Sequence, residues 1–275
     1  MKKQIRAIWL SDLHLGSREI NNSFLLDFLQ KHESEYLYLV GDILDLWKLG
    51  RRWHWPETNS RIIQLIMQKA NTGTKVIYIP GNHDEMIKQY AGNVINGIRI
   101  ATTAKHTTAD GREFLVTHGD EFDLIAQYSR WLAKIGSLAY DFLLRLNYYV
   151  NRMRRRCGCR YWSLSAYLKL KIKKAVNFIS RFEKRVMEVA VQHGVDGMIC
   201  GHIHNAAIEN FSGLTYGNTG DWVESCTALL EERNGHLKII RWTDECSVLF
   251  TEKSKPVLVP AYAPCLDNRR VVTTG

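Results

Sequence analysis

Five short motifs rich in aspartate and histidine could together bind metal ions. Two divalent cations that share one carboxylate need about seven protein ligands, and carboxylate, imidazole and amide oxygen suit manganese, iron, zinc or magnesium. Together the motifs supply seven candidate ligands of these kinds, and no cysteine belongs to the set. They predict a site for two divalent cations. The motifs are D-L-H at residues 12–14, G-D at 41–42, G-N-H-D at 81–84, T-H-G-D at 117–120 and G-H-I-H at 201–204.

Each motif follows an apolar run that has the length of a β-strand. We therefore expect all five motifs at the carboxyl ends of strands, where open α/β sheets bind ligands. In D-L-H, the alternation of side chains along an extended chain directs both ligands to the same side. The expected strands cover residues 5–10, 36–40, 75–80, 113–116 and 195–200.

One such motif alone has an ordinary structural interpretation. A single G-D or G-H is commonly a turn, and Asp12 and His14 alone could be a helix cap and a core histidine. Five motifs that each follow an expected strand favour the functional interpretation, because motif matches gain force from their structural context.

In these five motifs the chain resembles the calcineurin-like metallophosphoesterases, and the resemblance extends from residue 12 to residue 204. It implies a four-layer αββα sandwich and hydrolysis of phosphate esters or anhydrides by water whose pKa two cations lower. It also implies that His83 faces the phosphate and protonates the leaving oxygen, with Asp84 as its orienting partner. The implied ligands are Asp12, His14 and His204 for the first ion, Asn82, His118 and His202 for the second, and Asp42 as the bridge.

Asp120 lies two residues after His118 and has two interpretations. Ligating imidazoles usually donate their second N–H to a carboxylate or carbonyl, so Asp120 is a candidate for this contact. A capping role for a following helix is the alternative.

The basic charge of the chain is concentrated in one segment. The net charge is +9, and residues 121–190 contain fifteen Lys or Arg against five Asp or Glu, a net of +10. Apolar residues within 131–150 and 164–189 follow helical periodicity, with a basic turn at 152–160 between them. We expect a metallophosphoesterase core at 1–120 and 191–250, a helical lid insertion at 121–190 that covers the active site, and an irregular tail at 251–275.

The sequence allows several interpretations of what the insertion at 121–190 contacts. Its apolar stripes could simply pack on each other and on the core. Alternatively, they could hold a lipid while Arg154, Arg155 and Arg156 bind the substrate's phosphates and the insertion attaches to an anionic membrane surface. Nucleic acid is the competing acidic partner. Charged residues within 131–150 argue against a membrane span.

The place of the insertion sharpens the resemblance toward the UDP-2,3-diacylglucosamine diphosphatases of lipid A synthesis. This branch releases UMP, leaves an acylated sugar 1-phosphate and has a lid over the acyl chains. Its members typically read G-N-R-D where this chain has His83. Because His can protonate an alkoxide, a phosphodiester or phosphomonoester of a lipid, nucleotide or nucleic acid is the alternative substrate. A binding protein with a vestigial metal site is the alternative outside catalysis.

Cysteine usage and the amino terminus favour the cytosol. The apolar run before Ser11 has about five residues, too few for the hydrophobic region of a signal peptide. Six scattered cysteines show no secreted framework, and Cys157 and Cys159 are interpreted as turn thiols rather than zinc ligands. We therefore expect a cytoplasmic enzyme at the inner face of the membrane. Manganese is the first choice of ion.

Further strands at 206–210, 214–216, 227–231 and 237–242 predict a second sheet, and N-T-G-D-W at 218–222 is given a structural role.

Overall fold

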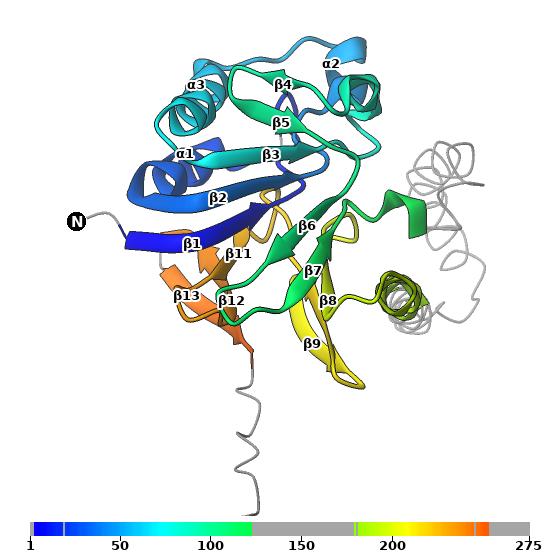
Figure 1. The fold of residues 1–275 in the computed structure, drawn as a ribbon. Helices are drawn as coiled ribbons and strands as arrows, with labels where there is room; N and C mark the ends of the chain where they lie inside the picture. The colour runs from blue at the N-terminus through cyan, green and yellow to red at the C-terminus, as the bar shows by residue number, and fades with distance from the viewer. Residues whose placement is uncertain (1–2, 19, 123–178, 180, 245, 253–275) are drawn as a thin grey trace, which may run out of the picture.

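Two β-sheets form the centre of the molecule (Figure 1). The computed structural model describes residues 3–18, 20–122, 179, 181–244 and 246–252. The larger sheet has eight strands in the order β13-β12-β11-β1-β2-β3-β5-β4, and β1, β2, β3 and β5 run parallel. Its strands are β1 (Lys3–Leu10), β2 (His32–Val40), β3 (Lys75–Ile79), β4 (Val94–Ile95), β5 (Ile98–Ile100), β11 (Thr227–Glu231), β12 (Leu237–Trp242) and β13 (Cys246–Thr251).

The smaller sheet has five strands in the order β6-β7-β8-β10-β9, with β7, β8 and β10 parallel. These strands are β6 (Ala104–Thr107), β7 (Glu113–Val116), β8 (Gly197–Cys200), β9 (Ala207–Phe211) and β10 (Leu214–Asn218). The helical elements are α1 (Asn22–Lys31), α2 (Leu46–Arg51), α3 (Glu57–Asn71), the short 3-10 helices η1 (Glu85–Tyr90) and η2 (Asp120–Phe122), and a helix over residues 181–193.

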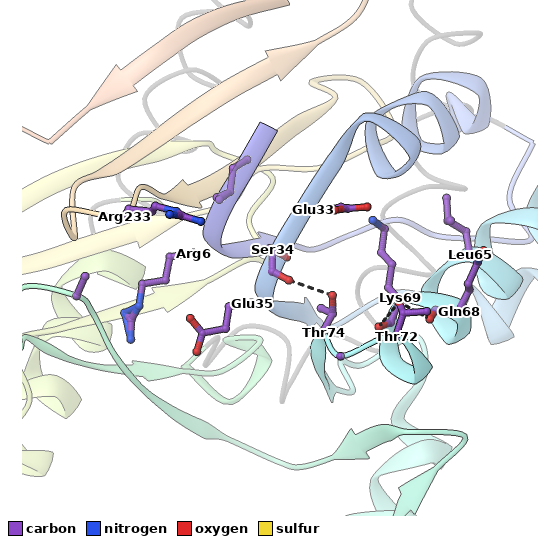
Figure 2. Close-up of a pocket in the computed structure, with 13 residues that line it drawn as sticks. Arg6, Glu33, Ser34, Glu35, Leu65, Gln68, Lys69, Thr72, Thr74 and Arg233 are labelled. Atoms are coloured by element: carbon purple, nitrogen blue, oxygen red, sulfur yellow. Dashed lines mark hydrogen bonds between the residues drawn. The ribbon is translucent and has the colours of Figure 1, made fainter. Parts of the chain in front are cut away.

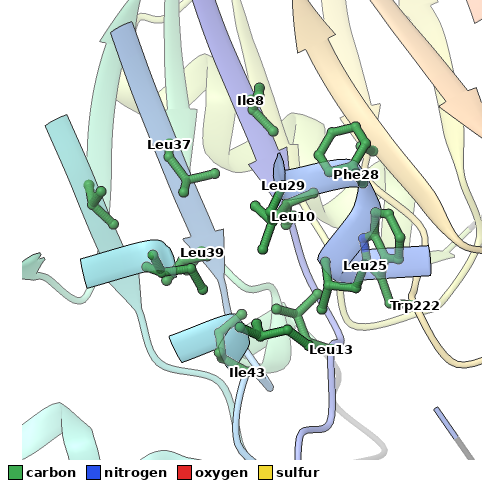
Figure 3. Close-up of a cluster of buried hydrophobic side chains, with 14 of the residues drawn as sticks. Ile8, Leu10, Leu13, Leu25, Phe28, Leu29, Leu37, Leu39, Ile43 and Trp222 are labelled. Carbon is green, nitrogen blue, oxygen red and sulfur yellow. The ribbon is translucent and has the colours of Figure 1, made fainter. Parts of the chain in front are cut away.

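Alternating side chains on the parallel strands feed two different cores, because successive residues of a strand point to opposite faces. Leu37 and Leu39 of β2 face α1 and α3, where they pack with Phe28 (Figure 3). Tyr38 and Val40 face the smaller sheet and join the core between the two sheets. Both faces of the second half of β2 are therefore buried, which explains the continuous apolar run at residues 36–40.

The helix over residues 181–193 covers the outer face of the smaller sheet. Its residues Phe182 and Val186 pack with Leu115 and Met198 in a third core. Three cores between successive layers give the order helix, sheet, sheet, helix, so the αββα architecture is confirmed.

The expected strands before the five motifs are confirmed as β1, β2, β3, β7 and β8. Strand β7 coincides with the expected residues 113–116, and the others differ only at their ends. The four later strands are present as β9 to β12, but they do not form one second sheet: β9 and β10 join β8, whereas β11 pairs with β1 in the larger sheet. Strands β4, β5, β6 and β13 were not expected. Most of the insertion at 121–190, including Arg154, Arg155 and Arg156, and most of the tail lie outside the described residues. Within the described part of the chain, no helix is both long and apolar enough to span a membrane.

Candidate active site

The predicted ligands are presented by loops whose backbone takes an uncommon conformation. Among the described residues other than glycine, eight have positive φ, and five of these are predicted ligands. L-residues rarely adopt this left-handed region, and such strain persists only where the surrounding structure imposes it. The five are Asp12 (φ 53°), His14 (47°), Asp42 (52°), His202 (68°) and His204 (53°).

Two motif glycines give these side chains room. A Cβ atom on Gly81 would lie 2.6 Å from His118 Nε2, and one on Gly41 would overlap the same ring. Gly41 also has a φ of 76°. Glycine is therefore needed at both positions, because any side chain would displace the His118 imidazole.

The carboxylate of Asp12 has one oxygen held by the protein and one directed toward histidines. Oδ2 accepts hydrogen bonds from the Ser11 hydroxyl at 2.5 Å and the His202 backbone N–H at 3.0 Å. Oδ1 lies 3.1 Å from His204 Nε2 and 3.9 Å from His14 Nε2. The structure thus brings together the three residues predicted to hold the first ion.

Asp42 lies between the two predicted sets of ligands. Its Oδ1 accepts the His83 backbone N–H at 2.8 Å, which fixes the carboxylate. Its Oδ2 is 3.9 Å from His14 Nε2 and 3.6 Å from His118 Nε2. One carboxylate oxygen therefore faces a histidine from each set, as a bridging ligand would.

His118 is held in the tautomer that metal binding needs. Its Nδ1 lies 3.0 Å from the Val40 carbonyl, and a carbonyl can only accept, so Nδ1 carries the proton. In neutral imidazole the lone pair then sits on Nε2, which faces Asp42. Burial alone would lower the pKa of His118, but the Asp42 and Asp12 carboxylates raise it to about 10. The site strongly favours positive charge, which a bound cation would supply in place of the proton.

Three unpartnered atoms test whether the site fits metal ions. Asp12 Oδ1, Asn82 Oδ1 and His118 Nε2 are buried and have no hydrogen-bond partner. Burying such groups is costly unless something binds them. All three belong to predicted ligands and all can donate electron pairs to a divalent cation. The His202 ring completes this region, with its centroid 5.1 Å from that of His118. The donor set therefore fits divalent ions.

The carboxylate beside His83 is Asp45, which the motifs did not identify. His83 Nδ1 lies 3.1 Å from Asp45 Oδ1, and His14 Nδ1 lies 3.6 Å from Asp45 Oδ2. Burial would raise the pKa of Asp45, but the nearby His14 imidazole and the hydrogen bond from His83 hold it well below its usual range. The spacing of Asp42 and Asp45 after one strand was the available signal.

Asp84 differs from its expected role as the partner of His83. Its buried carboxylate instead accepts backbone N–H groups from Ile43 at 2.8 Å, Leu44 at 3.3 Å and Gly81 at 2.6 Å. The Tyr78 hydroxyl makes a further short contact. Asp84 therefore ties the loop after β3 to the loop after β2, which positions His83 through the backbone.

Two further carboxylates lie close to the predicted ligands. Asp120 begins η2 and accepts a hydrogen bond from Lys88 Nζ at 2.9 Å, whereas the second nitrogen of His118 contacts the Val40 carbonyl. Asp221, in N-T-G-D-W, accepts backbone N–H groups from residues 223–225 and lies 3.9 Å from His204 Nδ1. This stretch, for which a structural role was expected, thus places the Asp221 carboxylate beside the predicted ligand His204.

A surface pocket lies near the amino-terminal ends of β1, β2 and β3, opposite the strand ends that carry the motifs (Figure 2). It is lined by Arg6 near the start of β1, Ser34 near the start of β2 and Thr74 before β3. None of the predicted site residues lines it, so its position separates it from the site described above.

Comparison with known proteins places the chain in a family. The profile of the calcineurin-like phosphoesterases matches residues 5–206. The chain therefore belongs to the calcineurin-like phosphoesterase family, whose members use a pair of divalent metal ions, and is a metal-dependent hydrolase.

Curated relatives extend the comparison over most of the chain. A UDP-2,3-diacylglucosamine hydrolase from Edwardsiella ictaluri is 26% identical over 75% of this chain and 78% of its own length. One from Haemophilus influenzae is 24% identical over 86% of this chain and 98% of its own length. Among solved structures, the phosphoesterase YfcE from E. coli superposes with a TM-score of 0.47 at 13% identity, covering 90% of this chain and 97% of that one.

Proposed function

We propose that this hydrolase cleaves the pyrophosphate of a UDP-linked acylated sugar similar to UDP-2,3-diacylglucosamine. The products are UMP and a lipid sugar 1-phosphate. The observation that carries the hydrolytic chemistry is the set of buried, unpartnered donor atoms on Asp12, Asn82 and His118. The shared name of the curated relatives supports the choice of substrate.

In this proposal each predicted residue has a defined task. Two divalent ions, with manganese as first choice and iron, zinc or magnesium as alternatives, supply charge for the phosphoryl oxygens and lower the pKa of water. Asp42 bridges, and His83 holds a proton at Nε2 for the leaving oxygen. The remaining ligands are Asp12, His14 and His204 for one ion and Asn82, His118 and His202 for the other.

His83 supports a second candidate function. Its Nδ1 has a carboxylate partner, Asp45, and such a pair suits proton transfer to a poor leaving group. An alkoxide needs that proton, whereas a leaving phosphate needs charge stabilisation more. The alternative is therefore a phosphodiesterase or phosphomonoesterase acting on another lipid, a nucleotide or a nucleic acid.

We also propose that the basic insertion at 121–190 attaches the protein to the anionic inner face of the membrane, with Arg154, Arg155 and Arg156 contacting substrate phosphates. The net charge of +10 in this segment supports the proposal. In flotation assays, binding to anionic vesicles should exceed binding to neutral ones and should fall as salt rises. Tighter binding to nucleic acid at equal salt would contradict it.

Hydrolysis of UDP-2,3-diacylglucosamine in oxygen-18 water tests the substrate and the bond cleaved. Attack at the phosphorus next to uridine puts the label in UMP, whereas label in the sugar 1-phosphate would mean attack at the other phosphorus. His83→Arg should be tolerated on this pyrophosphate but should cost about 100-fold on an alkyl ester. If the UDP-lipid is untouched and simple diesters are cleaved, the alternative function replaces the first.

A further inference from the structure

The indole of Trp47 stacks on the imidazole of His83. The ring centroids are 4.0 Å apart and the planes are inclined by 29°. Trp47 lies in the first turn of α2, two residues after Asp45, whose carboxylate contacts His83 Nδ1 at 3.1 Å. Asp45 is the N-cap of α2 and accepts the Lys48 backbone N–H at 2.9 Å. The start of one helix therefore contacts both the edge and the face of His83.

A third neighbour completes the enclosure of this ring. His14 packs edge-on against His83, with centroids 4.6 Å apart at 86°. The free nitrogen, Nε2, then faces Asp42, 3.9 Å from its Oδ2. Because Asp45, Trp47 and His14 restrict rotation of the ring, Nε2 remains directed at the space beside the predicted bridging ligand.

Trp47 is poorly placed for an ordinary packing role. Its side chain is 47% exposed, and α2 contains no buried residue. An aromatic side chain of this size usually stabilises a fold by being buried. Its stacked partner in the described structure is His83, so the main consequence of the contact is to fix that ring.

We propose that Trp47 is a positioning residue that holds His83 for proton transfer to the leaving oxygen of an ester, an inference that rests on the role of His83 in the second candidate function. In that step a water molecule loses one proton to the solvent, its oxygen forms a bond to phosphorus, and the bond to the leaving oxygen breaks. The leaving oxygen takes the proton from His83 Nε2. Misplacing a catalytic group by about 1 Å can lower the rate about 100-fold. Because only poor leaving groups need the proton of His83, loss of the stack should slow their release and leave the release of good leaving groups unchanged.

Two uridine esters separate this effect from a general loss of activity. Uridine 5′-(methyl phosphate) expels an alkoxide that needs a proton, whereas uridine 5′-(p-nitrophenyl phosphate) expels a stable phenolate. Trp47→Leu should lower kcat about tenfold or more on the methyl ester and less than about twofold on the p-nitrophenyl ester. Trp47→Phe should restore most of the loss. Trp53→Leu is the matched control, because Trp53 is 74% exposed and should leave both rates unchanged.

An NMR measurement tests the stack without turnover. The ring current of Trp47 should shift the His83 ring protons upfield in the wild type, and Trp47→Leu should remove that shift. Equal losses on the two esters, an unchanged rate on the methyl ester or an unchanged His83 spectrum would each overturn the positioning role. If the wild type cleaves neither ester, the second candidate function, hydrolysis of phosphate esters, fails, and the NMR comparison alone then decides whether Trp47 holds the ring.

Discussion

Asp42 Oδ2 and His118 Nε2 face each other across 3.6 Å without forming a hydrogen bond. The proton of neutral His118 is on Nδ1, where it binds the Val40 carbonyl, so both facing atoms present lone pairs. Two electron-pair donors at this separation repel unless a proton or cation joins them. This pair is therefore the clearest sign in the described structure that the site is built for cations.

Asp42→Asn should reduce metal-dependent hydrolysis by at least about 100-fold, because it removes the negative charge that both predicted ion positions share. The rate with bis(p-nitrophenyl) phosphate measures this directly. Asp244→Asn is the matched control, since Asp244 is exposed. Retention of more than about a tenth of the activity, far above the loss expected without metal assistance, would rule out Asp42 as the bridge.

Gly81→Ala should weaken metal binding, because the new methyl group would overlap Asp42 Oδ1 and lie 2.6 Å from His118 Nε2, and would displace both side chains. Binding of Mn²⁺ by calorimetry should weaken about tenfold or more, the size of effect seen when ligand orientation is lost. Gly50→Ala serves as the control, because a Cβ there meets nothing within 4 Å. Equal affinities in the two variants would contradict the assignment of Asp42 and His118 as ligands.

Asp45→Asn and Asp84→Asn should have different consequences. Asp45 contacts His83, so its variant should lose activity on alkyl esters by about 100-fold while its unfolding midpoint changes little. Asp84 accepts three backbone N–H groups, so its variant should lose about 2 kcal/mol of unfolding free energy. Urea titration and ester kinetics on both variants make the comparison. The reverse pattern would restore Asp84 as the direct partner of His83.

Glu183 should make the protein less stable as pH rises. Burial and then the neighbouring Glu209 raise the pKa of this carboxyl to about 7. A carboxyl with a raised folded pKa keeps its proton in the native state while the unfolded chain has lost it, so stability falls from about pH 4.5 to pH 7. Glu183→Gln should therefore be more stable than the wild type at pH 8, by about 1 kcal/mol after allowance for solvent screening.

Thermal unfolding at pH 4 and pH 8 measures this difference. The two proteins should unfold at similar temperatures at pH 4, where the carboxyl is protonated in both states. A stabilisation by Glu183→Gln that is equal at both values of pH would mean that the ionisation of Glu183 is not its cause.

Much of the fold could be predicted from the sequence because the apolar runs are continuous. The second half of β2 is buried on both faces, and each apolar run ends at a motif, so the carboxyl ends of the strands were clear. Strand β4 has two residues, both exposed, and such a strand leaves no apolar pattern to detect. The pairing of β13 with β12 likewise depends on tertiary contacts that local composition does not encode.

The site was predictable in its residue types but less so in its partners. Asp45 and Trp47 contact His83 only because α2 begins directly after the loop that carries Asp42. The left-handed backbone of Asp12 and Asp42 is imposed by the assembled loops, and the residue types give no warning of it. The role of Asp84 was implied by the family resemblance, whereas its carboxylate points back toward the chain after β2.

The most direct test of the two-ion site is the hydrolysis rate measured while Mn²⁺ is added stepwise to metal-free protein, with bis(p-nitrophenyl) phosphate as substrate. The seven-ligand arrangement predicts no turnover without the ion and a rate that reaches its plateau at two ions per chain. Full turnover in the presence of a chelator, or a plateau at one ion per chain, would contradict it.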